Sequence, residues 1–354
     1  METKKFIDVL EIYNGKNQKA VENPDGKYPI YGSGGVMGRA DEYICPAETV
    51  VIGRKGSINN PIFVTEPFWN VDTAFGLVAR KEVVLPKYLF YFCRYFDFEK
   101  LNTTVTIPSL TKANLLKIEM PVPSIIEQNN IVTKLNLLTN MIQQCQEQLT
   151  KLDELVKARF VEMFGTYPDN PFGWNTGKIQ DVVSDVRYGS SRPAVEGGKY
   201  PYLRMNNITY AGELDLTDTK RIDVPDNELD KCTVRRGDVL FNRTNSKELV
   251  GKTCVYNRDD MMVLAGFVIR VRVNERILPE FLVAFLNTDF SKQMLLGMCK
   301  TAIGQANINA KEMQNIGLYI PPIALQEQFV DLKNQIDKSK LLATLFAQSA
   351  CILA

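Results

Sequence analysis

The chain has 354 residues, of which 45% are hydrophobic and 23% charged, and this length predicts two domains, each with its own core. Its formal net charge is +1, which is less basic than expected of a protein that grips DNA alone through many phosphates, so either no nucleic acid is bound or a partner supplies much of the phosphate contact. No apolar run is long enough to cross a membrane, and the charged start, Met-Glu-Thr-Lys-Lys, is unlike a secretion signal.

Cysteine and histidine usage narrows the possible chemistry. The seven cysteines are scattered and never form Cys-x-x-Cys, which favours reduced thiols over a disulfide framework or a zinc site. The sequence contains no histidine, so Ser-His and Cys-His nucleophile pairs and histidine bases are excluded. We expect a cytoplasmic protein that holds no metal and does not contact a membrane.

Residues 1–122 alternate short β-type runs with turn clusters, which predicts a mixed α/β domain. A helix is expected at 86–96, with proline in its first turn, and a polar loop at 106–112. The aromatic residues of that helix are interpreted as core rather than as a platform for stacking bases. Strands are expected at 28–35, 48–57, 62–65, 73–79 and 116–123.

Residues 123–165 predict one long helix. Ser124 and Glu127 have the spacing of a capping box at its start, and Gly165 is a typical stop. At a rise of ~1.5 Å per residue the helix is ~60 Å long, which is typical of a spacer that sets a distance. Its apolar residues alternate steps of three and four, as in the seam of a coiled coil: Ile131, Leu135, Leu138, Ile142, Leu149, Leu152 and Val156.

Residues 165–354 repeat this order. Tyr200-Pro-Tyr-Leu corresponds to Tyr28-Pro-Ile-Tyr, and the strand that ends at Arg243 corresponds to the strand that ends at Arg54. The offset is 189 residues at the two arginines and 198 at the proline- and glutamine-containing segments 118–128 and 316–326, so the copies differ by small insertions. A duplicated module, each copy followed by a helix, explains this pattern.

The second helix is expected over 322–354. Its weaker seam contains Phe329, Leu332, Ile336 and Phe346. A long amphipathic helix alone would fit a dimerisation coiled coil equally well, but the repeat supplies an internal partner, so we expect the two helices to pair antiparallel. The second helix is short at its far end by comparison with the first, and Gln326-Glu327 stands slightly out of step with Glu127-Gln128.

Five segments carry a likeness to a known family: Pro-Val-Pro-Ser-Ile-Ile-Glu-Gln (121–128), Lys-Ala-Arg-Phe-Val-Glu-Met-Phe-Gly (157–165), Tyr-Pro-Tyr-Leu-Arg-Met-Asn-Asn-Ile (200–208), Arg-Gly-Asp-Val-Leu (236–240) and Pro-Pro-Ile-Ala-Leu-Gln-Glu-Gln (321–328). In their order and duplication they resemble the specificity subunit of type I restriction–modification systems over nearly the whole chain. The resemblance implies an α+β fold with two mixed α/β target-recognition domains, 1–122 and 166–321. A pair of long antiparallel helices, 123–165 and 322–354, would separate them as a coiled-coil spacer.

The same resemblance implies the partners. Each domain would read one half of a split site in double-stranded DNA. The chain would dock on methyltransferase subunits, which use S-adenosylmethionine, and through them on a restriction subunit driven by ATP and magnesium. The chain itself would hold no cofactor.

Three fragments resemble enzyme motifs but lack the parts that carry the chemistry. Gly251-Lys-Thr is the end of a P-loop whose first glycine is replaced by Ser246. Asn60-Pro-Ile-Phe lacks the second proline of the amino-methyltransferase motif and is better interpreted as a surface turn. Gly32-Ser-Gly-Gly is not a dinucleotide-binding fingerprint. We therefore predict a non-catalytic chain.

With catalysis set aside, the remaining candidates are side chains that could contact DNA bases. In the major groove Arg and Lys read guanine, and Asn and Gln read adenine. Arg54 and Arg243, at equivalent strand ends, are the strongest candidates, although a solvated turn residue is as compatible with each position as a base contact. A two-headed protein-binding scaffold without a DNA role is the alternative that the near-neutral charge allows. The candidate DNA-contacting residues are Ser33, Arg39, Arg54, Lys55, Thr106, Ser109 and Lys112 in the first copy, and Arg187, Tyr188, Ser190, Ser191, Arg204, Asn206, Asn207, Arg243, Asn245, Gln305 and Asn307 in the second.

Overall fold

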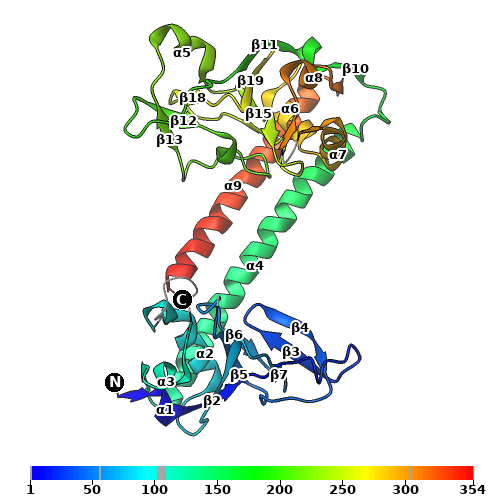
Figure 1. Cartoon of the computed structure of the whole chain (residues 1–354). Helices are drawn as coiled ribbons and strands as arrows, with labels where there is room; N and C mark the ends of the chain where they lie inside the picture. Colours follow the sequence, from blue (N-terminus) through cyan, green and yellow to red (C-terminus); the bar gives the residue numbers. More distant parts are fainter. Residues whose placement is uncertain (1, 56, 102–108, 303–304, 354) are drawn as a thin grey trace. The chain divides into compact units, whose positions relative to one another are not determined.

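A computed structural model describes residues 2–55, 57–101, 109–302 and 305–353 (Figure 1). The chain divides into two compact units, which we call the first unit (Met1–Gln144 with Ala347–Ala354) and the second unit (Cys145–Phe346). The long helix α4 (Ile125–Phe164) contributes residues to both. Within the described ranges, no helix combines the length and the apolar character needed to span a bilayer.

The first unit is built around an antiparallel sheet in the order β2-β8-β5-β6, beside a smaller sheet in the order β4-β3-β7. Helix α2 contacts β5, β6 and β8, and its buried residues are Tyr88, Leu89 and Cys93. The elements before α4 are β1 (Thr3–Lys5), α1 (Phe6–Val9), β2 (Leu10–Asn14), β3 (Tyr28–Gly32), β4 (Gly35–Ala40), β5 (Thr49–Gly53), β6 (Ile62–Val64), β7 (Trp69–Asn70), β8 (Ala74–Ala79), α2 (Pro86–Tyr95), the 3-10 turn η1 (Phe98–Leu101), α3 (Lys112–Leu115) and β9 (Glu119–Pro121).

The aromatic run on α2 is core only in part. Tyr88 is 8% exposed, and Phe90 and Phe92 pack against the same cluster. Tyr95, however, is 89% exposed. The interpretation of the whole run as core is wrong at this position, because Tyr95 is the last residue of the helix and lies outside its buried face.

The second unit repeats this topology. Its main sheet has the order β11-β19-β15-β17, and its second sheet has the order β13-β12-β18-β14. Its elements are β10 (Asn175–Lys178), η2 (Ile179–Val182), β11 (Val183–Tyr188), β12 (Tyr200–Leu203), η3 (Met205–Asn207), β13 (Lys220–Ile222), α5 (Asp226–Cys232), β14 (Thr233–Val234), β15 (Val239–Asn242), β16 (Thr244–Asn245), β17 (Thr253–Val255), β18 (Met262–Leu264), β19 (Val268–Val273), α6 (Pro279–Leu286), α7 (Asp289–Met298), β20 (Lys300–Ala302), β21 (Gln305–Asn307), α8 (Ala310–Gln314), β22 (Gly317–Ile320) and α9 (Ile323–Leu353).

The predicted repeat is confirmed down to individual strand pairs and hydrogen bonds. In the second sheet of each unit one pair is parallel, β3 with β7 and β12 with β18. The Arg54 amide donates to the Thr73 carbonyl at 2.8 Å, and the Arg243 amide donates to the Phe267 carbonyl at 3.0 Å. The carbonyls of both arginines accept a hydrogen bond at 2.9 Å, from Leu110 and Ile308 respectively. Arg54 and Arg243 therefore occupy equivalent backbone positions.

Both predicted ends of the first long helix are confirmed. The Ser124 amide donates to the Glu127 carboxylate at 3.0 Å, and the Glu127 amide donates to the Ser124 hydroxyl at 3.3 Å, which is a capping box. Hydrogen bonds from the side chain and amide of Ser124 hold the pKa of Glu127 below its ordinary value. The helix stops at Gly165, whose φ of +82° is in the region that favours glycine.

A buried glutamine joins each long helix to the module before it. The Gln128 side chain accepts from the Leu85 amide at 2.8 Å and donates to the carbonyls of Val83 and Pro123, both at 2.9 Å. Gln326 makes the same three bonds, with Leu278, Arg276 and Pro321. Both glutamines are fully buried. Gln326 is therefore the counterpart of Gln128, at the offset of 198, and the impression that these segments are out of step is wrong.

Replacing Gln128 with leucine is expected to destabilise the first unit by about 2–3 kcal/mol, because a main-chain amide and two main-chain carbonyls lose their fully buried partner. Thermal or urea unfolding of the whole chain measures the effect. Gln144→Leu, on the exposed face of the same helix, serves as the matched control and should change stability little. Equal stability of the two variants would contradict the role of the Gln128 side chain as a joint.

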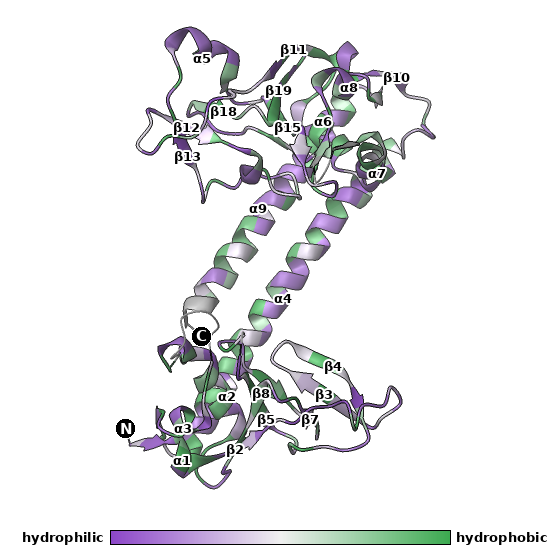
Figure 2. Cartoon of the chain, in the orientation of Figure 1, coloured by the Kyte–Doolittle hydropathy of each residue, from purple (hydrophilic) through white to green (hydrophobic). Residues whose placement is uncertain are grey.

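The two long helices pack antiparallel within the second unit. Near the end of α4, Phe160 and Phe164 contact Phe329 near the start of α9, with ring centroids 5.3 and 5.7 Å apart. Further along, Asp153 of α4 accepts from Lys340 of α9 at 2.8 Å. Because α4 numbers fall while α9 numbers rise along this contact, the helices run in opposite directions, as predicted. Figure 2 shows hydrophilic and hydrophobic residues interleaved along both helices.

The predicted seam residues are buried to very different degrees. Phe329 is fully buried, Ile336 is 7% exposed, and Val156 packs against the same core as Phe329. Phe346 remains 46% exposed, and Ile131 packs against the core of the first unit. The remaining seam residues are half-buried: Leu135, Leu138, Ile142, Leu149, Leu152 and Leu332.

Candidate nucleic-acid interface

In the first unit, the predicted contact residues that follow β5 lie close together. Arg54 and Lys55 are exposed, and Lys55 forms an isolated bridge with Ser109. Ser33, in the turn between β3 and β4, lies beside Gly53, so close that a Cβ on this glycine would meet the Ser33 Cβ at 3.1 Å. The Arg54 guanidinium stands 5.7 Å from the Phe75 ring. These residues form one polar, basic surface at the end of β5.

Two other candidates of the first unit use their donors internally. Arg39 donates from Nε to the Gly26 carbonyl at 2.6 Å and from Nη2 to the Lys27 carbonyl at 2.8 Å. Arg221 makes the equivalent pair of bonds in the second unit, which indicates that this arginine holds a hairpin in place. Lys112 donates to the Ile12 carbonyl at 2.8 Å. Thr106 lies outside the described residues.

In the second unit, Arg243, Tyr188 and Asn307 form one cluster. The Arg243 guanidinium stands 4.9 Å from the Tyr188 ring and donates to the Asn307 side-chain carbonyl at 3.2 Å. The Asn307 amide donates to the Thr244 hydroxyl at 2.9 Å, and the Tyr188 hydroxyl accepts from the Ala310 amide at 2.9 Å. The Arg243 Nε is buried and finds no acceptor within the described ranges. Arg243 is thus held in one orientation by Asn307 of β21 and Tyr188 of β11.

The other candidates of the second unit divide into paired and open side chains. Arg204 donates to the Asp218 carboxylate at 2.8 Å, and buried Asn207 donates to the Asp215 carbonyl at 2.8 Å. Ser190 is 8% exposed and accepts from the Arg192 amide. Ser191 and Asn206 are exposed, half-buried Asn245 accepts from the Ser246 amide, and Gln305 pairs through its backbone in β21.

Two further arginines of the main sheet in the second unit form ion pairs with the same carboxylate. Arg187 donates to Asp185 at 2.8 Å, and so does Arg270, whose side chain is only 3% exposed. Burial alone would raise the pKa of Asp185, but the hydrogen bonds from Arg270 and Arg187 outweigh it and hold this pKa below its ordinary value. Asp185 therefore stays ionised and partly balances Arg187, which weakens the attraction of Arg187 for a phosphate.

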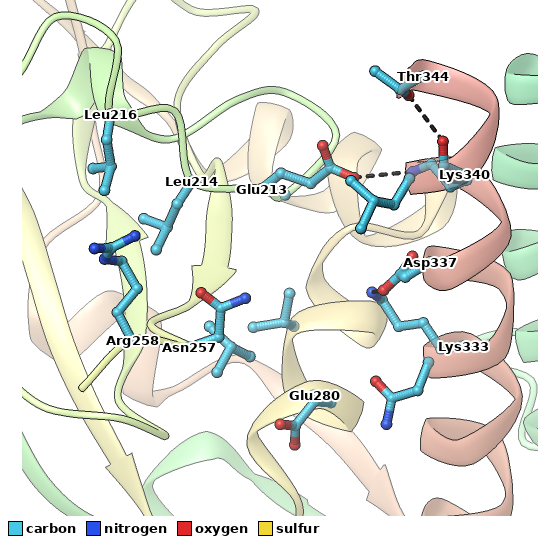
Figure 3. A pocket seen from close by; sticks show the side chains of 15 residues that line it. Glu213, Leu214, Leu216, Asn257, Arg258, Glu280, Lys333, Asp337, Lys340 and Thr344 are labelled. Atoms are coloured by element: carbon cyan, nitrogen blue, oxygen red, sulfur yellow. Dashed lines mark hydrogen bonds and ion pairs between the residues drawn. The ribbon is translucent and has the colours of Figure 1, made fainter. Parts of the chain in front are cut away.

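A cavity in the second unit contains paired charges. Figure 3 shows Glu213 reaching from its loop toward Lys340 of α9, and the Nζ–carboxylate distance is 2.9 Å. Lys340 also pairs with Asp153, and Lys333 pairs with Asp337 one turn away. Burial lowers the pKa of Lys340, but its two carboxylate partners outweigh this, so the pKa is raised overall. These pairs tie the loop and the two helices together.

The sequence did not predict that the side chain of Phe267 is exposed. The segment 265–271 reads as one apolar strand, which would bury this ring, whereas the structure places a turn before β19, and the ring is 52% exposed. The glycine at 266 is the signal that could have indicated the turn.

Comparison with known proteins identifies the fold and the family. The family model for the type I restriction modification DNA specificity domain matches residues 1–153 and 171–345. The S subunit of the type I restriction–modification system from M. genitalium aligns with a TM-score of 0.57 at 14% identity, covering 99% of this chain and 93% of that chain. At this identity the likeness shows the fold alone, with its mixed α and β modules and long helices.

Curated relatives agree with the family model. The chain is 21% identical over 322 residues to the type I restriction enzyme EcoKI specificity subunit of Escherichia coli (strain K12). It is 22% identical over 322 residues to the StySPI specificity subunit of Salmonella potsdam. Each alignment covers 84% of this chain and 69% of the relative. The resemblance seen in the sequence is confirmed: this chain belongs to the type I restriction–modification DNA specificity family, whose members are the non-catalytic subunits that recognise the DNA target.

Proposed function

We propose that this chain reads a split target in double-stranded DNA, with residues 1–122 on one half and residues 166–321 on the other. The observation that carries the proposal is the equivalence of Arg54 and Arg243, which occupy the same backbone position in two copies of one topology. An arginine at such a strand end has the planar fork that reads guanine.

The two modules differ in the side chains around these equivalent arginines. Arg54 is followed by exposed Lys55 and stands over Phe75, whereas Arg243 is held by Asn307 and stands over Tyr188. Because base recognition depends on such side chains while the strands only position them, the two half-sites should differ in sequence. The target is therefore expected to be asymmetric.

The chain is proposed to act with methyltransferase subunits that bind S-adenosylmethionine, and through them with a restriction subunit that uses ATP and magnesium. The near-neutral charge of +1 supports this division of labour, because a partner that contacts phosphates would supply the part of the affinity that this chain lacks. Residues 123–165 and 322–354 would then set the number of unread base pairs between the half-sites.

Mixing the purified chain with the methyltransferase subunits of the same organism should produce methylation at one sequence made of two unlike halves around a fixed gap. Mapping of methylated bases on random duplex DNA measures this. The chain alone should transfer no methyl group, and the methyltransferase alone serves as the control. Methyl transfer by the chain alone, a palindromic target, or a complex that binds DNA without sequence preference would contradict the proposal.

A further inference from the structure

A turn beside the Arg243 cluster presents an aromatic ring to solvent. Residues 265–267 connect β18 to β19, and the Phe267 side chain is 52% exposed. The Phe267 carbonyl accepts from the Arg243 amide at 3.0 Å, and the Gly266 amide donates to the Ser190 carbonyl at 2.7 Å. The Val268 amide closes the turn on the Ala265 carbonyl at 2.9 Å. Three backbone hydrogen bonds thus hold the turn that carries the exposed ring.

The turn contacts the cluster through Arg243, whose Nη1 donates to the Gly266 carbonyl at 3.5 Å. Tyr188, over which Arg243 stands, pairs with Ile269, two residues beyond Phe267 on the same chain segment. Tyr188 is 45% exposed. In the first unit the position equivalent to Phe267 is Thr73, whose carbonyl accepts from Arg54. The second unit therefore adds a large apolar group where the first has a small polar one.

The exposed ring can make only one kind of contact with a base edge. It has no hydrogen-bond donor or acceptor. In the major groove the apolar group that distinguishes one base from the others is the 5-methyl of thymine. Because the backbone of Phe267 is already fixed, the turn need not be ordered when the ring becomes buried against a ligand. The Arg243 guanidinium, which donates to the carbonyl of the preceding residue Gly266, is suited to the major-groove edge of guanine, so the ring and the guanidinium would face the same groove.

We propose that Phe267 selects a thymine in the second half-site by packing its ring against the thymine methyl group. This inference rests on the proposed function, because it requires residues 166–321 to read DNA. Loss of one buried methyl contact corresponds to about a fourfold change in affinity. The residue therefore determines specificity at one base pair next to the one read by Arg243.

The test replaces thymine with uracil, which removes only the methyl group, at each position of the second half-site on either strand. The complex of this chain with its methyltransferase subunits is titrated with each duplex, for the wild type and for Phe267→Ala. We expect one position at which uracil weakens wild-type binding about fourfold. Phe267→Ala should lose the same factor on thymine DNA and should lose nothing more on uracil DNA.

Two further variants make the result specific. Phe172→Ala removes a ring of equal exposure, 52%, elsewhere in the second unit, and should bind as the wild type does. Phe267→Leu keeps an apolar side chain and should keep part of the sensitivity to uracil, which shows that the response follows the contact if the alanine variant folds poorly.

Several outcomes would overturn the inference. If the contact exists, Phe267→Ala must bind thymine DNA less tightly than the wild type does, so equal binding refutes the inference. Weaker binding by Phe267→Ala without any response of the wild type to uracil would assign the ring another role, such as a wedge between base steps. A second half-site without thymine would also refute it. Failure of the wild-type complex to select any DNA sequence would instead refute the proposed function.

Discussion

Replacing Arg243 with alanine should relax recognition at one base pair of the second half-site and leave the first half-site unchanged. A bidentate contact between arginine and guanine contributes about 1–3 kcal/mol of discrimination, so preference for the correct base should fall roughly 5- to 150-fold. Arg54→Ala should have the reciprocal effect on the first half-site, because Arg54 holds the equivalent position there. Methylation of duplexes with single-base changes at every target position measures both effects.

Further variants distinguish the loss of a base contact from a disturbance of the local structure. Arg243 also bonds Asn307 and the Gly266 carbonyl, so alanine disturbs the cluster as well as the contact. Arg243→Lys keeps the positive charge but loses the planar fork, and it should lose base preference while keeping most of the total affinity. Arg236→Ala is the control, because this exposed arginine pairs with Asp259 instead. If the Arg54 and Arg243 variants each relaxed both half-sites, the assignment of one half-site to each module would be wrong.

Replacing Phe160 with alanine should destabilise the second unit by about 3–5 kcal/mol. Phe160 is 1% exposed and contacts Phe164, Phe281 and Phe329, with ring centroids 5.0 to 5.4 Å apart. These rings belong to α4, α6 and α9, so the cavity left by the substitution would lie where three helices meet. For a unit of this size the midpoint of thermal unfolding should fall roughly 6–20 °C.

The matched control is the next residue on the same helix. Val161 is 39% exposed, and Val161→Ala should change the free energy of unfolding by less than about 1 kcal/mol. Both variants keep the helix-forming tendency of α4, because alanine is the best helix former. Similar midpoints for the two variants would show that the aromatic cluster does not hold the helix pair together.

Features governed by local sequence were predicted from the chain alone. Ser124 and Glu127 predicted the start of α4 because a capping box involves only residues three apart, and Gly165 predicted its end because a positive φ favours glycine. The repeat was also readable, since two copies of one topology keep the same order of strand, turn and helix signals. The candidate Arg54 and Arg243 followed from that alignment.

Features governed by distant contacts could not be predicted in this way. The aligned segments pair Gln128 with Gln326, but each side chain bonds backbone groups more than forty residues away, and nothing in the local sequence identifies those groups. Asn207, an expected base reader, donates its side-chain amide to the carbonyl of Asp215, eight residues further along the chain. Phe267 reads as part of a continuous apolar strand until the turn at Gly266 is seen. In each case the polar or apolar character of the residue was evident, whereas its partner was not.

The glutamine joints have a consequence for how such a protein can change. Apart from the glutamine itself, each joint consists of main-chain amide and carbonyl groups, at Leu85 and Val83 in one copy and at Leu278 and Arg276 in the other. Every residue type but proline offers both groups, so the joint places almost no demand on the identity of the module attached to it. A different module grafted at this boundary would offer the same main-chain groups to the glutamine. Recombination could therefore join new pairs of modules, and with them new pairs of proposed half-sites, without changes to the long helices.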